Sequence, residues 1–132
     1  MKRILLLTGV LLILSSACAP RATIQSQPAL VEDTLYFGLD KPQGSVSDAE
    51  WNQFLSEEVT PRFPDGLTVW DAKGQWKEPN GKISKEPTKV LLLVHPDSLA
   101  EDKAIQTIIE LYKKNFDQES VMKVRTAADV SF

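Results

Sequence analysis

His95 and Cys18 are the chain's only histidine and only cysteine, so they are the first residues to consider for proton transfer, nucleophilic attack or metal binding. His95 could transfer protons near neutral pH, where imidazole changes its charge. It ends an apolar segment immediately before Pro96, and a partly buried residue at the end of a strand is the structural alternative. The sequence has no spacing of cysteines and histidines typical of zinc, so we expect neither a metal site nor a cofactor.

Arg62, Trp76 and Glu86 are the other side chains that could form a polar site with His95. Glu86 precedes the same apolar segment and could pair with Arg62 or Arg125, or hold a polar ligand group. Ordinary ion pairs are the alternative, because structural charge networks also perturb ionisable groups. Trp76 could stack on a ligand or pack against a hairpin. The sequence contains no nucleophile elbow, phosphate-binding loop or dinucleotide fingerprint, so no catalytic residue is assigned.

The first residues follow the three-part plan of a secretory signal. Lys2 and Arg3 precede an apolar run over residues 4–14, and small residues follow at 15–17. This run of eleven residues is shorter than the about 20 apolar residues that a membrane-spanning helix needs. We therefore predict a signal peptide over residues 1–17, in preference to a permanent transmembrane anchor.

Cys18 directly follows these small residues, in the order Ser-Ser-Ala-Cys. The pattern resembles the lipobox of bacterial lipoproteins, in which the cysteine is acylated and becomes the mature N-terminus. Buried acyl chains contribute about 0.8 kcal/mol per CH₂ to membrane binding, so lipid alone would anchor the protein. A conventional cut after Ala17 or Ala19 is the alternative, and it would leave a free thiol or no cysteine.

Loss of residues 1–17 removes Lys2 and Arg3, which leaves 13 basic against 18 acidic residues and a net charge of about −5. Such a charge disfavours nucleic acid and anionic headgroups as partners. The predicted location is the cell envelope, with the domain facing the periplasm. Ala19 stands where some Gram-negative lipoproteins carry a retention-signalling Asp, and this favours the outer membrane.

Residues 18–33 are polar, contain two prolines and lack a sustained apolar period, as is typical of a flexible tether. Residues 34–132 are enough for one domain. Ser47 with Glu50 is a capping box that begins a first helix, and Ser98 with Glu101 begins a second one. Short apolar runs between turn residues predict four strands, at 35–39, 67–77 with a bend or reversal near Gly74, 89–94 after a turn at 79–82, and 121–126.

The resulting order of strand, helix, strand, strand, helix, strand predicts an α+β domain of the ferredoxin-like split βαβ plan. Its antiparallel sheet would carry both helices on one face. The strand over 89–94 is apolar on both sides, because strand side chains alternate. We expect Leu91 and Leu93, joined by Tyr36 and Trp70, to form an apolar patch on the uncovered face, and such a patch is typical of a binding surface.

Four stretches together resemble the bacterial family catalogued as domain of unknown function 3574: TLYFGLDKP, TPRFPDGLTVWDAKGQW, SKEPTKVLLLVHP and FDQESVMKVRTAADVSF. The resemblance spans nearly the whole chain after the tether, and the run over residues 63–76 is its most specific part. It implies a small secreted or lipid-anchored domain. It brings no activity, substrate or catalytic residue.

Two functions remain as hypotheses. The first is a non-enzymatic envelope lipoprotein whose domain binds another envelope protein, or forms a homodimer, through the uncovered sheet face. The second is a small ligand-binding protein or enzyme that resembles the dimeric α+β barrels, with His95, Arg62, Glu86 and Trp76 as its first candidate residues. A closed pocket with convergent polar groups would favour the second hypothesis.

Overall fold

The computed structural model describes residues 29–131. The predicted signal peptide over 1–17 and the predicted lipidation site at Cys18 lie outside these residues. The elements follow one another as β1 (Leu30–Gly38), β2 (Asp40–Lys41), β3 (Gly44–Ser45), α1 (Asp48–Phe54), the π-helical turn η1 (Leu55–Val59), β4 (Thr68–Lys77), β5 (Ile83–Pro96), α2 (Leu99–Phe116) and β6 (Met122–Ala128).

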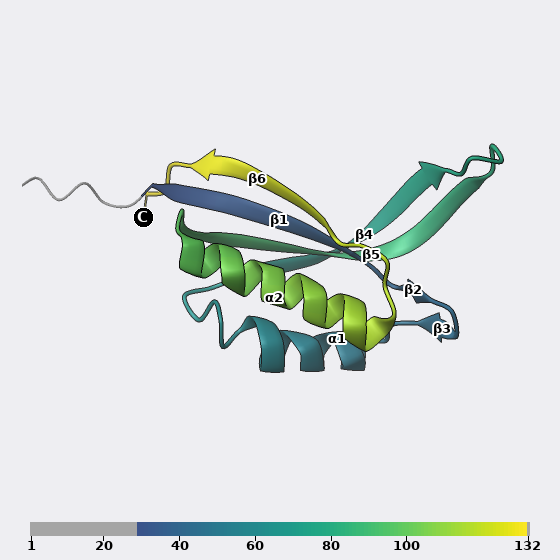
Figure 1. The fold of residues 1–132 in the computed structure, drawn as a ribbon, viewed down its shortest axis with the longest axis horizontal. Coiled ribbons are helices and arrows are strands. Elements are labelled where there is room, and N and C mark those ends of the chain that lie inside the picture. The colour runs from purple at the N-terminus through teal and green to yellow at the C-terminus, as the bar shows by residue number, and fades with distance from the viewer. Residues whose placement is uncertain (1–28, 132) are drawn as a thin grey trace, which may run out of the picture.

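The main sheet has four strands in the order β4-β5-β1-β6, and every neighbouring pair is antiparallel. Both helices lie on the same side of this sheet (Figure 1). The predicted ferredoxin-like α+β fold is therefore confirmed. The short strands β2 and β3, which the sequence did not predict, form a separate two-stranded pair.

Both predicted helices begin at the expected serine cap, but only the first forms the expected capping box. The Ser47 hydroxyl accepts the Glu50 N–H at 3.2 Å, and the Glu50 carboxylate accepts the Ser47 N–H at 2.7 Å, which completes a capping box. Glu50 also binds the Lys41 ammonium at 2.8 Å. These hydrogen bonds, the one from Lys41 first, lower the pKa of Glu50 to about 2. Ser98 caps α2 by accepting the N–H of Ala100 at 3.2 Å.

The core lies between the sheet and the helices and is rich in aromatic rings. Phe37 of β1 packs against Tyr112 of α2 with ring centroids 4.6 Å apart, in an edge-to-face arrangement. The Tyr112 hydroxyl donates to the carbonyl oxygen of Gly38 at 2.8 Å, and burial raises the pKa of Tyr112. Full burial of a large apolar side chain contributes about 1.5–3 kcal/mol. The buried cluster comprises Leu35, Phe37, Leu39, Val46, Trp51, Phe54, Val59, Phe63, Leu91, Leu93, Ile105, Ile108, Tyr112 and Phe116.

Strand β1 begins at Leu30, before the predicted start of the domain at residue 34. Residues 30–33 pair with both β5 and β6, so their assignment to the tether is corrected. The start of this strand was not predicted, because the adjacent carboxylates of Glu32 and Asp33 interrupt the apolar pattern from which a strand is predicted. Asp33 nevertheless points toward the helices and is fully buried.

Strand β4 continues through Gly74 to Lys77, so the alternative of a chain reversal at Gly74 is wrong. The reversal lies in the predicted turn at 79–82, where the N–H of Glu78 donates to the carbonyl oxygen of Lys82 at 2.9 Å and Gly81 has a φ of 89°. The β1–β5 pairing ends at Gly38 and Thr88. The remainder of the β4–β5 hairpin therefore projects beyond β1, on the side of the sheet away from the helices (Figure 1).

Candidate functional site

The four side chains predicted to form a polar site lie in separate parts of the fold. Arg62 reaches back one turn and donates to the carbonyl oxygen and the carboxylate of Glu58, at 2.5 and 2.9 Å. Trp76 lies on the projecting part of the hairpin and is 49% exposed. His95 is buried at the other end of β5, 4% exposed. The structure does not bring these residues together.

The Glu86 side chain lies against the backbone of Gly38 and Asp40, at the end of β1. Its carboxylate accepts the N–H of Asp40 at 3.0 Å, and a Cβ at Gly38 would come within 2.4 Å of it. Glu86 therefore pairs with neither Arg62 nor Arg125, and its position requires a glycine beneath it. A shallow groove of about 370 Å³ opens beside it, lined by Lys73, Gly74, Gln75, Lys85, Glu86 and Pro87.

Asp33 is the centre of a charge network that the sequence did not predict. It lies opposite Arg125 in the β1–β6 register, and the guanidinium donates to both carboxylate oxygens, at 2.9 Å from Nε and 2.6 Å from Nη2. His95 Nε2 lies 3.1 Å from Asp33 Oδ2, and its Nδ1 lies 2.9 Å from the carbonyl oxygen of Pro96. Both ring nitrogens thus lie at hydrogen-bond distance from an oxygen atom, so the network holds the ring on two sides.

The network continues to the start of α2. Arg125 also contacts the carboxylates of Asp97, at 3.1 Å, and Asp102. Burial would raise the pKa of Asp33, but hydrogen bonds from Arg125 and then His95, with the charge of Lys123, outweigh it and hold the pKa below its ordinary 3.8. The same contacts raise the pKa of Arg125.

This arrangement is that of an ion-pair network that joins β1, β5, β6 and α2. Asp33 is fully buried, and the ring of Phe63 lies 5.5 Å from that of His95. Among the described residues, every buried side-chain nitrogen and oxygen has a hydrogen-bond partner. The geometry therefore favours the structural interpretation of His95.

Among residues 29–131, no group of three or more His, Cys, Asp and Glu side chains is placed to hold a metal ion. No helix in this part of the chain is long and apolar enough to cross a membrane.

The sheet face opposite the helices is the remaining candidate. Leu91 and Leu93 were expected there, but both point toward the helices and are fully buried in the core, so that part of the prediction is wrong. The sequence showed that alternate residues of this strand face opposite sides, but it did not show which set the helices cover. The set that points away from the helices is Val90, Leu92 and Val94, of which Val90 is nevertheless buried.

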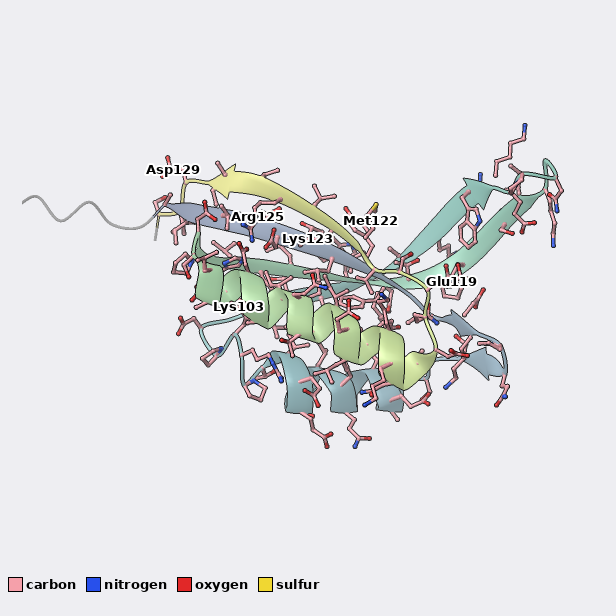
Figure 2. All side chains as sticks on the ribbon, viewed as in Figure 1. Lys103, Glu119, Met122, Lys123, Arg125 and Asp129 are labelled. Carbon is pink, nitrogen blue, oxygen red and sulfur yellow. The ribbon has the colours of Figure 1, made fainter. Side chains whose placement is uncertain are left out.

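We name the uncovered surface the open sheet face and define it by its half-buried and exposed apolar residues. Trp70 and Tyr36 lie on it as expected, in one cross-strand row with Val90 and Met122. Trp70 is 42% and Met122 57% exposed, and Met122 points away from the helices (Figure 2). The open sheet face comprises Tyr36, Trp70, Leu92, Val94, Met122 and Val124.

Charges are sparse on this face. Strand alternation and register place Glu32 in the row of Val94 and Thr126, toward one end, and Glu86 at the other end. The two central rows, through Tyr36 and Thr34, carry no ionisable group except the phenol of Tyr36. A contiguous apolar surface of this kind is typical of an interaction site.

The sequence matches the model of one protein family, described as protein of unknown function (DUF3574), over residues 32–132. No curated protein matches the chain at a significant level.

Several solved structures share the fold. The phage SAM lyase in complex with S-methyl-5'-thioadenosine has a TM-score of 0.60 and 12% identity, over 80% of this chain and 88% of its own. CutA from Synechococcus elongatus PCC7942 has a TM-score of 0.53 and 9% identity, over 77% and 79% of the two chains. CutA1 from Pyrococcus horikoshii OT3 has a TM-score of 0.50 and 11% identity, over 77% and 86%. At such identities the similarity shows the fold alone.

Proposed function

The chain belongs to the DUF3574 family of proteins of unknown function, and from that premise we propose that it is an envelope lipoprotein whose domain self-associates through the open sheet face. The observation that carries this proposal is the apolar character of that face. Trp70, Met122 and Val124 are each more than 40% exposed, and they lie on one side of one sheet.

The size of the face allows a small pairing interface. Nine residues of β1 at about 3.4 Å each, and three gaps of about 4.8 Å between four strands, span roughly 30 by 14 Å. This flat area is smaller than the about 800 Å² per partner of a standard interface, and side chains enlarge it. A face without a central charge meets a copy of itself without like-charge repulsion, which a two-fold symmetric contact requires.

Replacing Trp70 and Met122 together with Lys should leave the domain folded, because both side chains are exposed. Two lysines on the face would repel those of a second copy, and we expect the dissociation constant for self-association to rise at least 100-fold. Sedimentation equilibrium of the full-length protein in detergent measures this, and circular dichroism checks the fold. The matched control, Gln106→Lys with Thr107→Lys on exposed α2 positions, should associate like the wild type. A monomeric wild type at 100 µM, or unchanged association of the double variant, would contradict the proposal.

The lipid anchor is supported by the small residues that precede Cys18 and by its position after the apolar run. The mature protein from a bacterial host is expected to begin at Cys18 and to carry acyl chains, since the processed cysteine becomes the N-terminus. Mass spectrometry of the N-terminal peptide tests this, with Cys18→Ser as the variant that remains unacylated. An unmodified, water-soluble N-terminus would exclude the anchor.

A further inference from the structure

The β4–β5 hairpin extends past the sheet as an arm, defined here as residues 73–87. At its base, the N–H of Leu39 donates to the carbonyl oxygen of Pro87 and that of Asp40 to the Glu86 carboxylate, both at 3.0 Å. Beyond these contacts its two strands pair with each other, because β1 ends opposite Thr88. The arm is nevertheless closed at its tip, where Asn80 donates to Glu78 at 3.0 Å and its own side-chain oxygen accepts the N–H of Lys82 at 2.8 Å. A two-stranded hairpin is marginally stable in water on its own, so an arm of this length gains from a surface to pack on.

One side of the arm is basic and carries an exposed apolar residue near the tip. Alternation and register place Lys73, Lys77 and Lys85 on the same side as Ile83, which is 48% exposed and directly opposite Lys77. Within the described residues these three lysines take part in no ion pair. The protein as a whole is acidic, with a net charge of −3, so the arm concentrates charge of the opposite sign.

A groove on the helix layer has the complementary character. It lies between α1 with η1 and α2, has a volume of about 200 Å³, and is lined by Glu50, Gln53, Phe54, Glu57, Glu58, Asn115 and Phe116. Phe54 and Phe116 are buried and supply an apolar base, whereas Glu57 is exposed. Glu50 and Glu58 already pair with Lys41 and Arg62, at 2.8 and 2.9 Å. Glu57 takes part in no ion pair among the described residues, so it is the carboxylate that a basic surface around Ile83 would meet.

The arm cannot reach this groove in its own chain. It leaves the sheet on the side away from the helices (Figure 1), and the residues that line the groove belong to the helix layer. A contact between the two must therefore join different copies. Such a contact is heterologous, because it uses different surfaces of the two copies, and it closes a ring or adds further copies.

We propose that the arm of one copy docks in the acidic groove of a second copy, with Ile83 on the apolar base and Lys77 and Lys85 near Glu57. This contact is separate from the open sheet face and adds copies beyond the pair formed there. Since the charges that meet are exposed, the contact weakens as the salt concentration rises.

A charge exchange tests the contact. The arm variant Lys77→Glu with Lys85→Glu, and the groove variant Glu57→Lys with Asn115→Lys, each place like charges on both surfaces. We expect each variant alone to associate at least tenfold more weakly than the wild type through this contact. An equimolar mixture should regain tight association, because each variant then meets a surface of opposite charge. Sedimentation of the full-length proteins in detergent measures it, with circular dichroism as the check on folding.

The same comparison in the Trp70→Lys/Met122→Lys background separates this contact from the open sheet face. Regained association of the mixture there would support the arm contact even if the open sheet face forms no pair. Association of the arm variant equal to wild type, or a mixture that stays as weak as its components, would overturn it. The arm variant could instead lose binding to vesicles with about 30% anionic lipid and keep the self-association of the wild type. That result would overturn the proposal in favour of a contact between the arm and a membrane.

Discussion

Replacing Asp33 with Ala is expected to lower the free energy of unfolding by about 3–5 kcal/mol, the usual effect of removing one partner from a buried ion pair. Asp33 is the fully buried member of its network, Arg125 donates to both of its carboxylate oxygens, and His95 Nε2 lies 3.1 Å from one of them. The substitution leaves a buried imidazole and part of a guanidinium without the carboxylate that they face. That loss is a large fraction of the 5–15 kcal/mol that typically stabilises a domain.

Urea denaturation of the full-length protein in detergent measures this change. The matched control is Glu32→Ala, because Glu32 is the neighbouring carboxylate on the opposite side of the same strand and contacts only the Thr34 hydroxyl, at 3.3 Å, among the described side chains. We expect Glu32→Ala to cost less than about 1 kcal/mol. Equal effects of the two substitutions would contradict the assignment of Asp33 as the centre of the network. A double-mutant cycle with Arg125→Ala would give the coupling energy directly.

The same network predicts the direction of a pH dependence. The folded-state pKa of Asp33 lies below its ordinary value of 3.8, so its contribution is complete above that value. It is lost as the pH falls through the lower, folded-state pKa. The difference in unfolding free energy between the wild type and Asp33→Asn should therefore be constant near neutral pH and become smaller below about pH 4.

Much of the fold could be predicted from local signals. The capping residues Ser47 and Ser98 and the turn at 79–82 each act within a few residues, and each is found where expected. The start of β1 depends instead on contacts distant in sequence. Asp33 is separated from Arg125 by 92 positions, and a carboxylate that is buried because of so distant a partner has no local signature.

The open sheet face, too, could be predicted only in part from local signals. Alternation correctly separated the two sides of β5, but the choice of the covered side depends on how the helices pack. One signal was available. Val31, Asp33, Leu35 and Phe37 are spaced by two, so the single carboxylate among them indicates a buried charge that needs a cation. Arg125, within the last predicted strand, was the natural partner.

Replacing Leu93 with Lys is expected to unfold the domain, whereas Val94→Lys one position further should leave it folded. Leu93 is fully buried between the sheet and the helices, while Val94 is 39% exposed on the open sheet face. Even truncation of a buried Leu costs about 2–5 kcal/mol, and a lysine in its place adds the desolvation of an unpaired ammonium. Together these effects are comparable to the whole stability of a domain.

The pair of variants therefore distinguishes the two sides of one strand. Thermal unfolding followed by circular dichroism should show no transition for Leu93→Lys and a transition close to that of the wild type for Val94→Lys. Sedimentation of Val94→Lys should then show weaker self-association, because its lysine lies on the open sheet face. If Leu93→Lys folded and lost association while Val94→Lys kept it, the binding surface would lie on the side of β5 that faces the helices, and the helix layer would have to move to expose it.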